Sequence, residues 1–118
     1  MFRILTVLTI LFVGFSARAE SFLSILDDVP LMPGLSEQAD AGMVFDSPQG
    51  RLAETHASGP VTADAVAAFY DQTLPQLGWA RQGPNLFLRE GESLHLMTES
   101  TGAAVVTVRF ALKPATNP

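Results

Sequence analysis

His56 and His95 are the only two histidines in the 118-residue chain. Imidazole is the side chain most suited to acid–base work and metal binding near neutral pH. Both histidines lie in predicted strands beside small or apolar residues, where they could bind a metal together with Glu54 or Glu99. Zinc sites use three or four closely spaced ligands, so surface or edge histidines are the favoured interpretation, and no metal or other cofactor is expected.

Serine, carboxylate and phosphate-binding patterns give no stronger signal. A hydrolase nucleophile needs a Gly-x-Ser-x-Gly turn, and four serines in predicted turns or at strand ends lack those neighbours: Ser47, Ser58, Ser93 and Ser100. The acidic pairs Asp27-Asp28 and Glu90/Glu92 lie in predicted turns, where carboxylates are ordinarily solvated. The glycines are dispersed and form no phosphate-binding loop. We therefore expect a protein that is not an enzyme and has no catalytic residue.

The central part of the chain has the pattern of an amphipathic helix. Thr62 is placed to cap its start. Apolar residues then recur at spacings of three and four and predict one stripe that packs on a sheet: Val66, Phe69, Tyr70, Leu74 and Leu77. Pro75 is expected to kink the last turn or to end the regular helix near Thr73, and Gly78 permits a left-handed stop. The helix is expected over residues 63 to about 77.

Residues on both sides of this helix alternate with the period of two that is typical of strands. A hairpin is expected over residues 43–46 and 51–58, and three further antiparallel strands over 85–90, 93–99 and 103–113. One face of the last strand is apolar: Ala104, Val106, Val108, Phe110 and Leu112. The order β-β-α-β-β-β predicts an α+β fold, a two-layer sandwich in which one long helix lies on one face of a mostly antiparallel sheet.

The residues before the first hairpin predict a short N-terminal helix over 21–28 and an ordered apolar loop over 29–35. We expect the loop to pack across one end of the core, and a peptide-binding lip is the alternative. In this organisation residues 20–42 are an N-terminal segment, residues 43–113 form the domain, and residues 114–118 are a frayed tail.

The first nineteen residues have the three parts of a cleavable signal peptide. Arg3 gives a positive start, the twelve residues 4–15 are uncharged and mostly apolar, and Ala17-Arg18-Ala19 is a small-x-small cleavage motif. A helix that spans a bilayer needs about 20 apolar residues, so cleavage after Ala19 and a periplasmic or secreted location are expected. Arg18 lies inside the cleavage motif and is not ideal there, so the alternative is that the segment stays uncleaved and anchors the protein to the membrane. The chain has no cysteine, which excludes an amino-terminal lipid, disulfides and thiol chemistry.

Cleavage would make an acidic chain more acidic. Residues 1–19 contain two of the seven bases and none of the twelve acids, so the remaining 99 residues carry five bases and twelve acids, a net charge of −7 (5 − 12). The five bases do not cluster in the sequence. Because nucleic acids and anionic lipid surfaces are bound by clustered Lys and Arg, nucleic acid is not expected as a partner.

The helix end carries a pattern that can be compared with known proteins. Phe69-Tyr70, Leu74-Pro75 and Gly78-Trp79 form a Phe-Tyr-x3-Leu-Pro-x2-Gly-Trp motif, which resembles the helix-to-strand junction of small uncharacterised secreted or periplasmic proteins of proteobacteria. With a similar segment at 29–35, the resemblance covers most of residues 29–112. The predicted arrangement is also loosely similar to the helix-on-sheet domains of the assembly lipoprotein BamC, whose lipid-bearing cysteine this chain lacks. The resemblance implies a fold and an envelope location, and carries over no catalytic residue.

A well-specified fold without a catalytic pattern favours a non-enzymatic module that binds an envelope protein, through a free sheet face or by strand addition. Trp79, Phe87 and Met97 would form its apolar surface if they were exposed together, and otherwise they complete the core. The alternative function is a periplasmic protein that binds a small apolar ligand between the helix and the loop at 30–35. A histidine-dependent enzyme is the third hypothesis.

Overall fold

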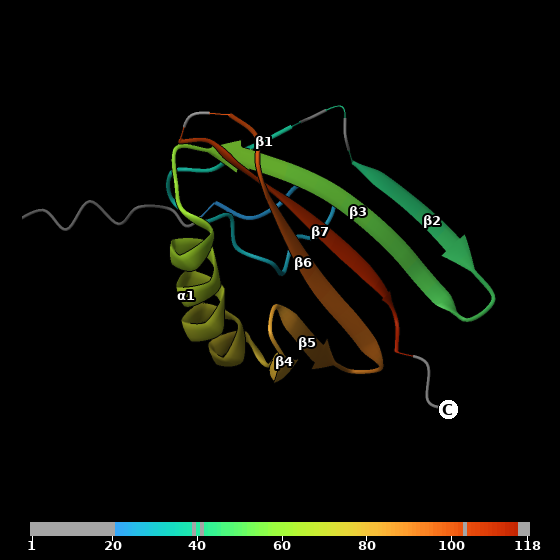
Figure 1. Cartoon of the computed structure of the whole chain (residues 1–118). Helices are drawn as coiled ribbons and strands as arrows, with labels where there is room; N and C mark the ends of the chain where they lie inside the picture. The colour runs from blue at the N-terminus through green and yellow to red at the C-terminus, as the bar shows by residue number, and fades with distance from the viewer. Residues whose placement is uncertain (1–20, 39, 41, 103, 116–118) are drawn as a thin grey trace, which may run out of the picture.

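The computed structural model describes residues 21–38, 40, 42–102 and 104–115, so the expected signal peptide lies outside the described residues. The described chain forms a seven-stranded antiparallel sheet with one α-helix, α1, packed across one face (Figure 1). The expected α+β class, with a single helix on a mostly antiparallel sheet, is therefore confirmed.

All strand pairs are antiparallel, and the order across the sheet is β1-β3-β7-β6-β5-β4. β2 pairs with the first part of β3, and β1 pairs with its last part. Both therefore lie along the same edge of β3. The bounds are β1 (Ser36–Glu37), β2 (Met43–Ser47), β3 (Gly50–Gly59), β4 (Ala80–Gly83), β5 (Leu86–Arg89), β6 (Glu92–Ser100) and β7 (Val106–Pro114).

The helix begins and ends at the expected signals. α1 (Ala63–Thr73) is capped by Thr62, whose Oγ1 accepts a hydrogen bond from the Ala65 amide at 3.0 Å. After Thr73 the chain tightens into the 3₁₀ helix η2 (Leu74–Leu77), because Pro75 lacks the amide hydrogen that a regular helix would use. Gly78 then turns the chain with φ of 94°.

The core lies between the sheet and the second layer formed by α1 and residues 21–35. Three residues of the helical stripe are buried: Val66, Tyr70 and Leu74. The rings of Tyr70 and Phe110 pack edge to face, with their centroids 5.5 Å apart. Leu77, in the 3₁₀ turn, is instead 36% exposed. The strands contribute nine buried apolar side chains: Ala53, Ala57, Phe87, Leu94, Leu96, Val106, Val108, Phe110 and Leu112.

Residues 21–35 form turns and an isolated bridge between Phe22 and Pro30 in place of the expected helix over 21–28. The Leu23 amide donates to the Val29 carbonyl at 3.0 Å, which folds the segment back on itself. Leu23, Leu26 and Val29 are all buried, so packing on the core outweighs the weak helical pattern. The expectation for the loop at 29–35 is confirmed, since Val29 and Leu35 belong to the core.

The sheet also contains two strands that the sequence did not predict. β4 (Ala80–Gly83) has no apolar alternation and forms because it pairs with β5. β1 has two residues and pairs with the end of β3. In addition, β7 reaches Pro114, and the Ala115 amide donates to the Gly91 carbonyl at 2.7 Å, so the ordered chain extends two residues into the expected tail.

Candidate functional site

Trp79, Phe87 and Met97 do not form the apolar surface that was the alternative to their burial in the core. Trp79 is 2% exposed and Phe87 is fully buried, whereas Met97 is half-buried on the other side of the sheet. Phe87 pairs with Leu94 on the face that α1 covers, which places its ring in the core. Trp79 packs under the Arg89 guanidinium, whose central carbon lies 4.5 Å from the ring centroid. These two aromatics therefore complete the core.

The two histidines lie on separate strands and do not form a ligand set. His56 is on β3 and His95 on β6, with β7 between them, so the two strands are roughly 10 Å apart. Nε2 of His56 is 3.8 Å from Oε1 of Glu54, but that carboxylate is already held by Arg109, with Nε–Oε1 at 2.8 Å and Nη2–Oε2 at 2.9 Å. Across the described residues, no three His, Asp or Glu side chains are placed to hold one metal ion.

Several of the other candidate groups have structural partners, whereas the buried Ser93 hydroxyl has no hydrogen-bond partner among the described residues. Asp28 forms an ion pair with Arg89, and Glu92 lies 3.7 Å from Arg51. The Ser47 hydroxyl donates to the Gly50 carbonyl at 2.7 Å, which fixes the β2–β3 turn. These contacts stabilise the termini of strands and the N-terminal segment, and they leave these side chains without the geometry of a nucleophile or a general acid.

The sheet has a second face, turned away from α1, which we call the open face. Cross-strand pairs share a face of a sheet, so the strand register assigns its members. They include Met43 and Phe45 on β2; Leu52, Glu54, His56 and Ser58 on β3; Thr107, Arg109, Ala111 and Lys113 on β7; Ser93, His95, Met97 and Glu99 on β6; and Leu86 and Leu88 on β5. The open face thus mixes apolar residues with an ion pair and both histidines.

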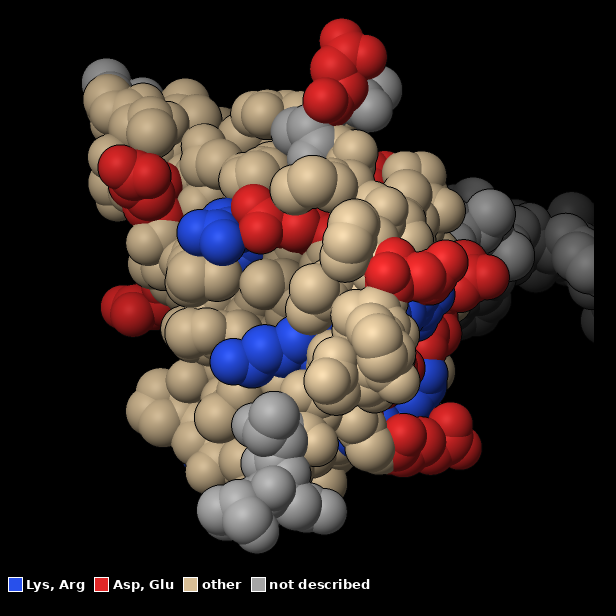
Figure 2. Space-filling view, turned by 90° about the vertical axis from the view of Figure 1, so that its right-hand side faces the viewer, with Lys and Arg blue, Asp and Glu red and all other residues tan. Residues whose placement is uncertain are grey.

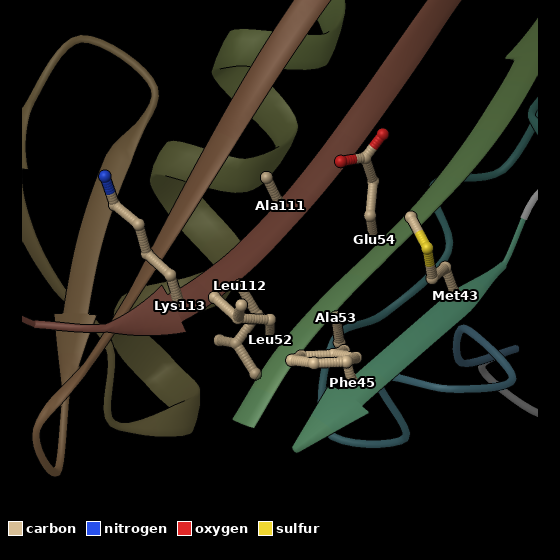
Figure 3. A pocket seen from close by; sticks show the side chains of 8 residues that line it. All are labelled: Met43, Phe45, Leu52, Ala53, Glu54, Ala111, Leu112 and Lys113. Atoms are coloured by element: carbon tan, nitrogen blue, oxygen red, sulfur yellow. The ribbon is translucent and has the colours of Figure 1, made fainter. Parts of the chain in front are cut away.

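A shallow hollow of about 370 Å³ lies on the open face where β2, β3 and β7 meet. Met43, Phe45, Leu52 and Ala111 give it an apolar lining, and Glu54 and Lys113 stand beside them (Figure 3). Glu54 is neutralised by Arg109, whereas Lys113 is exposed and forms no ion pair with any residue the structure describes. The hollow therefore combines apolar walls with one free cation.

The β2–β3 hairpin that borders the hollow exposes large apolar side chains. Met43 is 61%, Val44 49%, Phe45 62% and Leu52 40% exposed. Met43, Phe45 and Leu52 lie together on the open face and expose roughly 300 Å² of apolar surface, the size of patch that commonly marks an interaction site, whereas Val44 lies on the opposite face of the strand. We call Met43, Phe45 and Leu52 the hairpin patch.

The charges around the hairpin are separated rather than clustered. On the face shown in Figure 2, Lys and Arg occupy isolated positions, several of them beside acids. All four arginines of the described chain contact a carboxylate: Arg51, Arg81, Arg89 and Arg109. The face in Figure 2 therefore shows no cluster of bases of the kind that binds nucleic acid.

No known protein family, curated protein or solved structure matches the chain. Within the described residues, no helix is both long enough and apolar enough to cross a membrane. The candidate site therefore rests on the geometry of the open face and the hairpin patch.

Sequence reasoning missed the hairpin patch, although a signal for it was present. Met43-Val44-Phe45 places apolar side chains on both faces of one short strand next to a turn. A strand that is buried on one face normally alternates apolar and polar residues, so three apolar residues in succession indicate a strand with both faces buried or with an exposed apolar face.

Proposed function

We propose that the protein is an exported, non-enzymatic envelope module that binds a partner protein through the open face around the hairpin patch. Export is supported by the signal-like residues 1–19, and the absence of a catalytic pattern in the sequence supports a binding role. The observation that carries the proposal is the exposure of Met43, Phe45 and Leu52 on one corner of the open face.

The physical reason is the cost of leaving this surface in water. Each Å² of apolar surface that a partner covers contributes about 25 cal/mol, so covering a few hundred Å² supplies several kcal/mol toward binding. The neighbouring Glu54–Arg109 pair and Lys113 would lie at the rim of such a contact, where charged groups set orientation more than affinity.

Capture of partners from the envelope fraction of the source cells tests this proposal. Leu52→Glu should abolish recovery of a partner that the wild type retains, because it places a charge in the centre of the patch. Leu77→Glu is the matched control, since Leu77 is 36% exposed against 40% for Leu52 but lies at the end of η2. Equal recovery by both variants, or recovery of nothing by the wild type, would refute the proposal.

A second candidate function is the binding of a small amphipathic ligand in the hollow. Its volume of about 370 Å³ falls in the range of small-molecule sites, and Lys113 is placed to meet an anionic head group beside apolar walls. This location differs from the pocket expected between the helix and the loop at 30–35. That loop is instead fixed to the helix by the Tyr70 hydroxyl, which donates to the Pro30 carbonyl at 2.8 Å.

A thermal-shift experiment with a medium-chain fatty acid below its micelle concentration tests the second candidate. A ligand of the folded state raises the melting temperature with its concentration, and Ala111→Phe should remove that rise by filling the hollow. A rise of equal size in Ala111→Phe would show that the fatty acid binds elsewhere.

A further inference from the structure

We infer that the outer edge of β2 pairs with β2 of a second copy of this chain, which joins two sheets into one across a two-fold axis. Within the part of the chain that the structure describes, β2 pairs with β3 on one side and with no strand on the other. In Figure 1 it lies at the side of the sheet away from α1. Its backbone groups on that side are therefore free to form a ladder.

The two edges of the sheet differ in how they are protected. β4, at the other edge, carries Arg81, has a bulge between Arg81 and Gly83, and is followed by Pro84. Charge, a bulge and a nearby proline are the features by which natural sheets prevent edge-to-edge pairing. β2 also carries a charge, Asp46, and is followed by Pro48, but its register with β3 has no bulge and its first three residues, Met43-Val44-Phe45, are uncharged and exposed. The bulge thus distinguishes β4 from β2, and the apolar half of β2 is open to pairing.

The sequence of β2 is complementary to itself in one antiparallel register. When Val44 lies opposite Val44 of the second copy, Met43 lies opposite Phe45 of that copy, and Phe45 opposite Met43. A two-fold axis perpendicular to the sheet keeps side chains on their own face, as this register requires, because Met43 and Phe45 share the open face. Every pair in the centre is then apolar.

Charge does not oppose a second copy in this register. Asp46 of one copy is four residues from Asp46 of the other along the strand direction, roughly 13 Å, which exceeds the screening length of about 8 Å at physiological salt. Asp46 also has Arg51 opposite it on β3. No like charges are therefore brought together, although the chain as a whole is acidic.

The area of the contact sets its strength. Met43, Val44 and Phe45 supply roughly 300 Å² per copy, or about 600 Å² in total, which lies below the 1,200 Å² of a stable interface. The dimer is thus weak and concentration-dependent. In this dimer Met43 and Phe45 of the second copy extend the apolar surface beside each hollow. The two hollows then lie on one continuous open face.

Cross-linking measures the register directly, because the chain has no cysteine of its own. Val44→Cys should form an intermolecular disulfide under mild oxidation, since paired Cα atoms in an antiparallel ladder are about 4.5–5.5 Å apart and a disulfide accepts 4.4–6.8 Å. Ser47→Cys is the matched control: in this register the two Ser47 positions are roughly 20 Å apart. We expect at least tenfold faster cross-linking of Val44→Cys. Equal rates, or faster cross-linking of Ser47→Cys, would overturn the inference.

Sedimentation equilibrium between about 10 µM and about 1 mM, the range expected for a contact of this size, supplies a second measurement. The wild type should gain mass with concentration, whereas Val44→Lys should remain a monomer and Gln82→Lys, on β4, should behave as the wild type. Leu52→Glu should still dimerise, because Leu52 lies one strand in from the edge. A monomeric wild type, or dimers of Val44→Lys, would overturn the inference, and neither result bears on partner capture through Leu52.

Discussion

Tyr70→Phe removes a single oxygen atom that connects the helix to the N-terminal segment. The Tyr70 hydroxyl donates to the Pro30 carbonyl at 2.8 Å and accepts from the Met32 amide at 3.2 Å. The ring itself is fully buried against Phe110, and phenylalanine would keep that contact. The substitution therefore isolates the two hydrogen bonds from the packing of the ring.

The expected loss of stability follows from the hydrogen bonds that the Pro30 carbonyl and the Met32 amide would lose. The Pro30 carbonyl is buried, so leaving it without a donor costs about 1–3 kcal/mol, and the half-buried Met32 amide adds less because water can reach it. We expect the free energy of unfolding to fall by about 2 kcal/mol, a factor of about 30 in the ratio of folded to unfolded chains. Urea denaturation followed by circular dichroism measures this change. A loss below about 0.5 kcal/mol would show that the hydroxyl does not anchor the segment.

The pH dependence gives an independent readout from the same residue, which is the only tyrosine in the chain. Burial raises the pKa of Tyr70 above its ordinary value of about 10, and the Met32 hydrogen bond only partly offsets this. Above pH 10 the unfolded chain loses a proton that the folded chain keeps, so stability falls as the pH rises, by up to about 1.4 kcal/mol per pH unit. Tyr70→Phe should lack this slope. Equal slopes in both proteins would contradict the burial argument.

Two further substitutions test how the N-terminal segment is held. In Gly59→Ala the new Cβ would lie 1.9 Å from the Gly34 carbonyl oxygen, so we expect a loss of about 2–3 kcal/mol in urea denaturation, against less than about 0.5 kcal/mol for Gly83→Ala, where nothing lies within 4 Å. The Glu37 carboxylate accepts from the Ser24 amide at 3.0 Å and also from its hydroxyl. Glu37→Gln should lower stability by about 1 kcal/mol and speed hydrogen exchange at the Ser24 amide, and unchanged exchange would contradict this role.

The helix and the long strands could be predicted because their signals are local. Thr62 caps α1 as expected, and the alternation of residues 106–112 fixes which face of β7 is buried. β1 and β4 could not be predicted, since neither has an apolar alternation and each exists only because a neighbouring strand offers a partner. The turns at 21–28 were missed because their apolar residues fit a helix locally and a folded-back loop globally.

The candidate site was harder to predict than the fold. Trp79 and Phe87 are large and apolar, and the sequence alone could not decide whether they are buried against the sheet or exposed to solvent. The hairpin patch depends on which face of the sheet α1 covers, and this is a property of the assembled sheet. The sequence disfavoured a metal at the two histidines because too few ligands lie near them, and the structure shows β7 between their strands.

The width of the sheet explains why Val44 is exposed on the face that α1 covers. Six strands lie side by side at about 4.8 Å spacing, so the sheet is roughly 24 Å across, whereas a helix with its side chains covers about 10 Å. Residues 21–35 cover much of the remainder through Leu23, Leu26 and Val29, and β2 lies at the margin of that cover. An antiparallel sheet can leave one face in water, but it then alternates apolar and polar residues. Because β2 does not alternate, its exposed residues are better explained by a surface that another chain covers than by one adapted to solvent.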